Sequence, residues 1–239
     1  LRIVIGVVLL IAMCFVLSVY VPYQRELRIA RRIAILKGAP HWRYRGPDWI
    51  PPAWHDRLAF WERIDVVHLD GCDLPADLLA ELGSLTSIDT LGLSRTHMSD
   101  ELLKQLRGLT NLETLELIQT DITDAGLEHL EDLTSIKRLY LGDTAVTGAG
   151  LKHLKGLTKL EELDLGQTLV TDSGLESLKG LERLERLDLN YTQVTDVGML
   201  HLKGLTNLQF LILNDTQVTT EGRSLLRKAL PTCHVIPEP

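Results

Sequence analysis

The sequence has few of the residues that mark a disulfide scaffold or a metal-binding finger. Its 239 residues include only three cysteines, Cys14, Cys72 and Cys233, and none of them belongs to a CxxC pair. Small secreted modules usually carry an even number of closely spaced cysteines, so this count excludes a disulfide framework. We interpret the three thiols as isolated small apolar residues.

Recognisable catalytic motifs are absent as well. The chain contains no GxSxG, no GxxxxGK[ST] and no HExxH, and no cysteine has a histidine partner at a suggestive spacing. We therefore predict a protein that is not an enzyme, with no catalytic residues, no cofactor and no small-molecule substrate. An unrecognised site on a repeat-built surface is the alternative.

Positive charge is scarce beyond the first quarter of the chain. Residues 1–60 hold nine Lys/Arg and three Asp/Glu, a net charge of +6, whereas the whole chain carries −7, so the remaining 179 residues carry −13. Nucleic acids bind basic surfaces, because affinity comes from neutralising phosphates. An acidic domain of this size predicts that nucleic acid is not its ligand.

The N-terminus holds the one long apolar run. Nineteen residues from Ile3 to Val21 carry no charge, and a helix of that length nearly spans a hydrocarbon core of about 30 Å. We predict a transmembrane anchor over residues 1–23, with membrane contact through residues 3–21. A cleaved signal peptide is the alternative, but its apolar core would be shorter and would end in a small-x-small cleavage site.

Basic residues follow the apolar run and suggest its orientation. Five of them lie just after it, against only Arg2 before it. Cytoplasmic flanks of membrane spans are enriched in Lys and Arg, so we predict a single-pass membrane protein with a cytoplasmic repeat domain. The opposite orientation stays open, because residues upstream of Leu1 would change the balance. The five are Arg25, Arg28, Arg31, Arg32 and Lys37.

A connector over residues 24–60 joins the anchor to the acidic domain. The spacing of Leu27, Ala30, Ile33 and Ala34 predicts a short basic helix that ends near Gly38. A Trp/Pro-rich segment follows, in which Pro51 and Pro52 would open a further short helix. We interpret this segment as a cap over the first repeat, with a membrane-surface or partner-binding aromatic patch as the alternative. The tryptophans are Trp42, Trp49, Trp54 and Trp61.

From residue 61 to residue 229 the chain repeats every 24 residues, without insertion. One leucine column is Leu85, Leu109, Leu133, Leu157, Leu181 and Leu205, and further apolar columns follow it by three, six and eight residues. A degenerate first copy carries Ile64, Val67, Leu69 and Cys72 in the matching positions. A fixed period of this length is typical of a solenoid, so we predict seven stacked units.

The physical role of each column follows from its pattern. The LxL alternation predicts a strand with leucines such as Leu163 and Leu165 in the core. A threonine column after each strand would bond to loop backbone, and a second Ser/Thr column would cap short helices whose first turn holds aspartate. Glycines such as Gly108 and Gly156 are expected to end each helix in the left-handed conformation. Glycines such as Gly174 inside the helices are expected to allow close packing.

The pattern LxxLxxLxLxxTxVTDxGLxxLxxL resembles the leucine-rich repeat, closest to the short bacterial and cysteine-containing types. Threonine replaces the usual asparagine after the strand, and Cys72 stands there in the first copy. The resemblance implies an α/β right-handed solenoid, with parallel strands on the concave face and short helices on the convex face. The anchor, the cap and a closing segment at residues 230–239 are similar to bacterial membrane-anchored proteins of this kind.

Two convex columns suggest ions, and both readings are weak. His129, His153 and His201 share one position, but their spacing does not suit a single closed site, so we predict no metal. The aspartate column lacks the glycine-rich nonapeptide of calcium-binding β-rolls. The sequons beginning at Asn190 and Asn214 fall on the outward strand face, and we interpret them as chance matches.

The concave strand face is the predicted functional surface, because its outward residues vary between repeats while the leucines do not. Charged, aromatic and apolar side chains of this kind suit a protein or peptide partner bound without chemistry. A solvated face without a ligand is the alternative, and the protein would then be a structural spacer or scaffold at the membrane. The predicted binding residues are Glu116, Arg138, Tyr140, Glu162, Asp164, Arg186, Asp188, Tyr191, Phe210 and Ile212.

Overall fold

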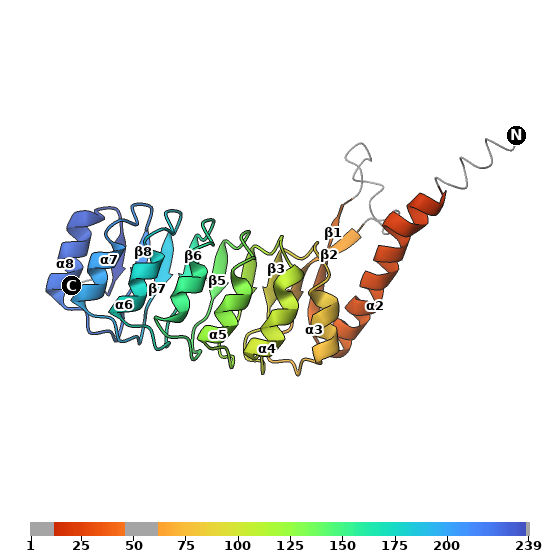
Figure 1. Cartoon of the computed structure of the whole chain (residues 1–239), viewed down its shortest axis with the longest axis horizontal. Helices are drawn as coiled ribbons and strands as arrows, with labels where there is room; N and C mark the ends of the chain where they lie inside the picture. The colour runs from red at the N-terminus through yellow and green to blue at the C-terminus, as the bar shows by residue number, and fades with distance from the viewer. Residues whose placement is uncertain (1–11, 46–61, 238–239) are drawn as a thin grey trace, which may run out of the picture.

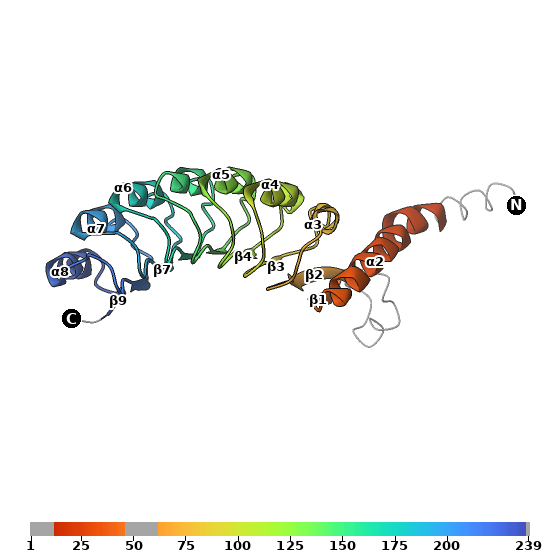
Figure 2. The same ribbon diagram turned by 90° about the horizontal axis from the view of Figure 1, so that it is seen from below.

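The computed structural model describes residues 12–45 and 62–237, and it shows a curved solenoid (Figure 1). Its strands form one nine-stranded sheet in the order β1 to β9. β1 runs antiparallel to β2, and every later neighbour is parallel. Viewed along the other axis, the strands line the inner side of the arc and the helices its outer side (Figure 2). The predicted parallel-stranded solenoid is therefore confirmed for the repeats.

The elements recur at nearly constant spacing along the chain. The strands are β1 (Ala39–Tyr44), β2 (Glu62–His68), β3 (Thr90–Gly92), β4 (Thr114–Glu116), β5 (Arg138–Tyr140), β6 (Glu162–Asp164), β7 (Arg186–Asp188), β8 (Phe210–Ile212) and β9 (His234–Ile236). The α-helices are α2 (Val21–Ile35), α3 (Ala76–Leu82), α4 (Asp100–Leu103), α5 (Asp124–Leu127), α6 (Asp172–Leu175), α7 (Asp196–Leu202) and α8 (Thr220–Ala229). Short 3₁₀ segments continue several of them or replace them, at Lys104–Gly108, Glu128–Leu130, Gly150–Leu154 and Glu176–Leu178.

Stacked leucines fill the interior between the strands and the helices. Leu163 and Leu165 are 1% and 0% exposed, whereas Asp164 between them points to the concave face and lies half-buried there. The threonine column closes the interior, since each hydroxyl donates to the carbonyl three residues earlier at 2.6–2.8 Å. Thr168, for example, is 3% exposed and bonds to the Leu165 carbonyl. These hydroxyls satisfy backbone oxygens in the interior, as the sequence predicts.

Consecutive repeats are joined on the convex side by an aspartate, a threonine and a glycine. Asp124 accepts hydrogen bonds from the backbone N–H and the hydroxyl of Thr147 in the next repeat, at 2.7 and 2.6 Å. The same carboxylate leaves no space at Gly150, where an added Cβ would lie 2.4 Å from Asp124 Oδ1. Asp100, Asp172 and Asp196 repeat the arrangement. The glycine column therefore makes room for the carboxylate of the preceding repeat.

Between Asp100 and Asp196 this interlock is interrupted once. Gly148 stands at the position of the aspartates, so Thr171 has no carboxylate across the boundary, and its hydroxyl lies 3.4 Å from that of Ser173. The two repeats approach more closely here, because a Cβ at Gly174 would lie 2.3 Å from the Gly148 Cα. Backbone-to-backbone contact thus replaces the hydrogen-bonded bridge at this boundary.

The predicted left-handed helix ends are wrong. Among the described glycines, only Gly71 has a positive φ, and Gly108, Gly156, Gly180 and Gly204 do not. The left-handed residue stands just before each column threonine, where the chain leaves the strand, with φ between 53° and 58° in six repeats. Those residues are Arg95, Gln119, Asp143, Gln167, Tyr191 and Asp215. The chain therefore reverses after the strand at ordinary residues, at a small steric cost in each repeat.

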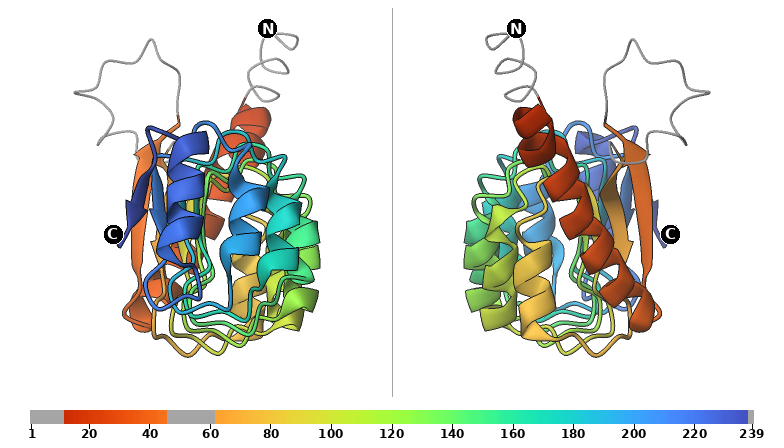
Figure 3. Two further views of the ribbon diagram at one scale, coloured as in Figure 1. Left: turned by 90° about the vertical axis from the view of Figure 1, so that its left-hand side faces the viewer. Right: turned by 90° about the vertical axis from the view of Figure 1, so that its right-hand side faces the viewer.

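The N-terminal helix and β1 cover the open end of the first repeat (Figure 3). The buried side of α2 consists of Glu26, Ile29 and Ile33, whereas Ala34 is exposed, so the predicted stripe is shifted by about one residue. The Glu26 carboxylate accepts the Ile64 N–H at 2.7 Å, and its burial raises its pKa. Trp42 on β1 packs against the core edge and meets the Tyr23 ring edge-on. The strand at residues 39–44 was not predicted.

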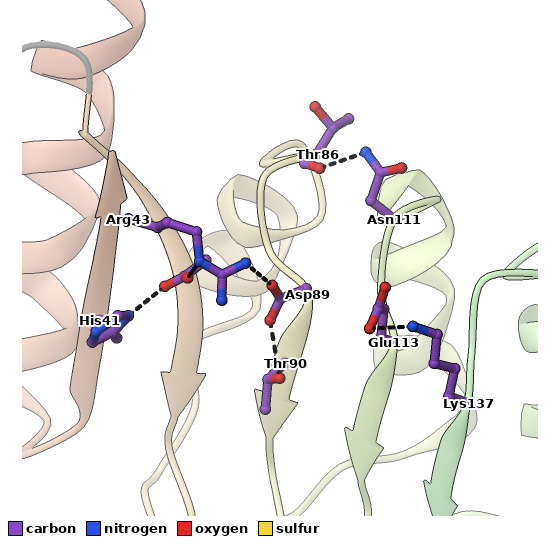
Figure 4. A network of polar contacts seen from close by, with 9 residues as sticks. His41, Arg43, Thr86, Asp89, Thr90, Asn111, Glu113 and Lys137 are labelled. Atoms are coloured by element: carbon purple, nitrogen blue, oxygen red, sulfur yellow. Dashed lines mark hydrogen bonds and ion pairs between the residues drawn. The ribbon is translucent and has the colours of Figure 1, made fainter. Parts of the chain in front are cut away.

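Salt bridges fasten the cap to the repeats. Arg43 on β1 contacts the fully buried Asp65 at 2.7 Å and Asp89 of the next repeat at 2.9 Å (Figure 4). His41 Nδ1 lies 2.7 Å from Asp65 on its other side. A buried carboxylate without such partners would be costly, so these contacts allow Asp65 to stay inside. Beyond them, Lys137 and Glu113 continue the line of ion pairs along the solenoid edge.

The predicted anchor lies only partly within the described residues. One continuous helix runs from residue 12 through a π-helical turn at Val16–Tyr20 into α2, and its N-terminal part projects away from the repeats (Figure 1). Met13, Leu17 and Val21 on it are 54%, 63% and 49% exposed. No helix within residues 12–45 or 62–237 is both long and apolar enough to span a membrane. Residues 3–11 and the expected cap tryptophans at 49, 54 and 61 fall outside the described residues.

The interlock predicts different costs for two equivalent threonines. Thr147→Val removes a hydroxyl that donates to Asp124 and accepts the Ala149 N–H, so we expect a loss of about 1–3 kcal/mol of unfolding free energy. Thr171 faces Gly148 and has no such carboxylate partner, so Thr171→Val should change the free energy of unfolding by less than about 0.5 kcal/mol. Urea unfolding with unchanged slopes is the measurement, and equal losses in the two variants would contradict the role given to the aspartate column.

Candidate functional site

Two parallel rows of side chains cover the concave face, one on each side of the central strand leucine. The row before the leucine holds Arg138, Glu162, Arg186 and Phe210 in register on β5 to β8. The row after it holds Glu116, Tyr140, Asp164 and Asp188 on β4 to β7. Register pairing places these predicted residues side by side, because neighbouring parallel strands lie about 4.8 Å apart.

Polar contacts fix side chains between and within the two rows at the centre. The Tyr140 hydroxyl donates to Glu162 Oε2 of the next repeat at 2.8 Å. Burial, together with this bond and the Glu162 charge, raises the pKa of Tyr140 to about 12. Arg138 Nε donates to the Thr114 hydroxyl at 3.0 Å. These hydrogen bonds therefore hold the Tyr140 and Arg138 side chains in place.

Asp164 and Asp188 form the acidic centre of the face. A hollow of about 310 Å³ lies beside them over Gly142 and Gly166, and a smaller one of about 100 Å³ lies between Tyr140 and Arg186. The glycines make this space, since a Cβ at Gly166 would lie 3.2 Å from Asp164 and 3.3 Å from Asp188. Burial raises the pKa of Asp164, and the nearby Asp188 charge raises it further.

The apolar end of the predicted site differs from expectation. Phe210 is 39% exposed, stacks on His234 and lies 6.0 Å from the Arg186 guanidinium. Ile212 was expected to face outward, but it is only 8% exposed, because β9 pairs beside β8 and places Ile236 opposite it. The outward apolar patch therefore consists of Phe210, with Ile236 at 38% exposure on the last strand.

Tyr191 lies beside the strand face, in the left-handed turn after β7. Its side chain is 60% exposed and borders the larger hollow. A hydrogen bond to the Asp215 carboxylate raises its pKa. The ring is thus available to a partner at the edge of the concave face.

A cluster that the sequence analysis did not single out lies at the N-terminal end of the same face. His68, Asp70 and Glu116 bring one ligand atom each within 4.8 Å of one another, and no other such trio occurs among the described residues. The degenerate first repeat concealed it, although His68, Gly92 and Glu116 share one strand column. The convex histidines behave differently, since His129 contacts Arg107 and His153 contacts Glu131.

Comparison with known proteins agrees with the fold. A family model described as leucine rich repeat matches residues 134–194, so this part of the chain is similar to the leucine-rich-repeat family. No curated protein matched the chain.

Three of the solved structures with a similar fold are from bacteria. An internalin (inlF) from Listeria monocytogenes aligns with TM-score 0.62 and 23% identity, covering 74% of this chain and 54% of its own. Internalin C2 from the same species aligns with TM-score 0.57 and 25% identity, covering 72% of this chain and 80% of its own. A leucine-rich-repeat protein from Leptospira interrogans aligns with TM-score 0.53 and 22% identity, covering 72% of this chain and 48% of its own. The chain thus spans about half the length of two of them, and these likenesses support the fold.

The raised pKa of Asp164 predicts a pH-dependent stability. Its proton is held more tightly in the folded chain than in the unfolded chain, so the ionised carboxylate destabilises the fold at neutral pH. Asp164→Asn keeps an acceptor for the Gly166 N–H and should unfold at higher urea concentration than wild type at pH 7. The difference should shrink as the pH falls toward the ordinary aspartate value of 3.8 and should be absent below it, because the carboxyl group is then protonated in both states.

A matched control distinguishes this effect from a general change in net charge. Asp132 is exposed on the convex side, and Asp132→Asn should leave the urea midpoint at pH 7 nearly unchanged. An Asp164→Asn midpoint that equals wild type at pH 7, or an advantage that grows in acid, would show that Asp164 is well solvated.

Proposed function

We propose that the protein is a non-catalytic interaction module that binds another protein or a peptide through its concave face. The observation that carries the proposal is the central part of this face, where the two hollows share Asp164 and Asp188 beside Tyr140 and Arg186. Side chains that differ between repeats stand there on a scaffold of nearly invariant leucines. Fixed aromatic and charged groups around a recess are typical of binding hot spots.

The charge of the centre favours a partner with basic and aromatic side chains. Asp164 and Asp188 border the larger hollow, and a Lys or Arg side chain entering it would offset their mutual repulsion. Arg138 and Arg186 alternate with Glu162 in the adjacent row and would fix the partner's register. Phe210 offers an apolar contact at the far end.

Membrane attachment belongs to the same proposal. The apolar run of residues 3–21 would anchor the chain, and the exposed apolar side chains of Met13, Leu17 and Val21 fit a surface in contact with lipid. The excess of basic residues after the run favours a cytoplasmic repeat domain. The projecting helix would then hold the solenoid close to the bilayer.

The concave-face proposal is tested by partner capture with charge-matched variants of the full chain. The triple variant Tyr140→Phe, Asp164→Asn, Asp188→Asn removes two charges and one hydroxyl with little change of shape. We expect proteins cross-linked to wild type to fall at least about tenfold, because several binding contacts are lost together. Quantitative mass spectrometry of the cross-linked proteins is the measurement.

The matched control removes the same charge from the convex side. Glu128→Gln with Asp132→Asn, both exposed there, should retain the wild-type set of partners. If the concave variant also retains that set, the concave face is not the binding surface, and the spacer or scaffold reading takes its place.

The anchor is tested by extraction from isolated membranes. Leu10→Arg with Leu17→Arg places two charges inside the apolar run, each costing about 2.5–3.5 kcal/mol in a membrane-spanning helix. We expect wild type to stay with membranes in alkaline carbonate and this variant to be released. Ile35→Arg, on the same helix but outside the run and 79% exposed, is the control.

The orientation is tested by protease accessibility of the repeats. Repeats that resist protease until cells are permeabilised would support the cytoplasmic orientation, whereas cleavage in intact cells would reverse it.

A further inference from the structure

The cluster of His68, Asp70 and Glu116 lies on the concave face, where the cap meets the repeats. His68 ends β2, and Glu116 ends β4 two strands away. Gly92 occupies the position between them on β3. His68 and Asp70 therefore come from the first repeat and Glu116 from the third, and the three side chains meet only in the folded solenoid.

Gly92 is what allows the three groups to meet. A Cβ at this position would lie 2.7 Å from His68 Nδ1 and 2.9 Å from Asp70 Oδ2, so the imidazole and the carboxylate lean over the glycine. Any other residue in this column would separate His68 from Glu116. The strand position without a side chain thus forms the floor of the cluster.

The cluster has the spacing of ligands around an ion, and it lacks the close contacts of a self-paired group. His68 Nδ1 and Asp70 Oδ2 lie 3.7 Å apart, which is too long for a hydrogen bond. Bonds of about 2.0–2.1 Å to a tetrahedral ion place neighbouring ligand atoms about 3.3 Å apart. All three ligand atoms lie within 4.8 Å of one another, and none of the three side chains is fully buried, so a small closing movement would complete the set.

Asp70 is already oriented for this role. Its Oδ1 accepts the Ser94 N–H at 2.7 Å, which leaves Oδ2 directed toward His68. Asp70 and Glu116 also bring one carboxylate oxygen each within 4.8 Å of the other. A bound cation would relieve the repulsion between these two carboxylates.

We propose that His68, Asp70 and Glu116 form a binding site for a divalent transition-metal ion such as Zn²⁺. One imidazole nitrogen and two carboxylate oxygens are donors that such ions accept, whereas Ca²⁺ takes six to eight oxygen ligands. Three protein ligands leave at least one coordination position open toward the concave face. A side chain of a bound protein would supply the fourth ligand at that position. The site therefore adds to the proposed function without depending on it.

The test is a zinc titration of the full chain, purified in detergent and stripped of metal with a chelator. Wild type is expected to bind one equivalent of Zn²⁺ by isothermal titration calorimetry and to gain thermal stability from it, because the ion binds the folded state. Ca²⁺ and Mg²⁺ should give no comparable binding. Equal affinity for Ca²⁺ would overturn the assignment to a transition metal.

Variants decide whether the ion sits in this cluster. His68→Ala and Glu116→Gln should each weaken Zn²⁺ binding by roughly 100-fold and abolish the thermal shift. Gly92→Ala changes no ligand atom but occupies the floor, so it should weaken binding as well. Unfolding in the absence of zinc checks that each variant is folded.

The control is a similar pair without a third ligand. His97 Nδ1 lies 3.6 Å from Asp121 Oδ2, and His97 is 95% exposed. His97→Ala should bind Zn²⁺ as wild type does. Affinity unchanged in His68→Ala and Glu116→Gln, or lowered equally in His97→Ala, would show that the ion binds elsewhere on the protein and would overturn the proposal.

Discussion

The spacing between neighbouring strands, about 4.8 Å, is the constraint on which the rest of the structure depends. It places each side chain against the residue 24 positions away, so a column of the sequence becomes a row in space. Leucines in such a row exclude water, and each buried threonine donates a hydrogen bond to a backbone carbonyl of its own turn. An aspartate in the row must find room in the next repeat, which is why Gly150 lies over Asp124. On the concave face the same spacing forces Asp164 against Asp188.

The sequence predicted the structure well at positions that recur in six repeats, because the copies can be compared with one another. The leucine columns, the threonine hydroxyls and the packing role of Gly174 all follow from patterns that a single copy would not reveal. It failed for the left-handed turns because glycine, the usual sign of that conformation, stands there only in Gly71. The stacking of the strands imposes the left-handed turn at Tyr191, and a tyrosine in the sequence gives no sign of that conformation.

The ends of the chain were harder to predict, because their residues have no copies to compare. The burial of Glu26 contradicts the simple apolar stripe expected of α2, and β1 has no repeat that would reveal it. The concave residues were placed correctly by alternation, except for Ile212, which β9 covers, and Tyr191, which lies in the turn after β7. His68 was missed for the same reason, since its repeat matches the pattern poorly. Whether the concave rows bind a partner depends on chemistry outside the chain.

The two outermost strands also bear on how the molecule meets its own copies. Pro40 lies within β1, and Pro237 follows β9 directly. Proline has no backbone N–H to offer to an approaching strand, and sheet edges that carry it resist further pairing. A stack of nearly identical parallel strands is otherwise well suited to continue from one molecule into the next. Proline within one outermost strand and directly after the other disfavours further pairing there, and so works against growth of this regular solenoid into a fibre.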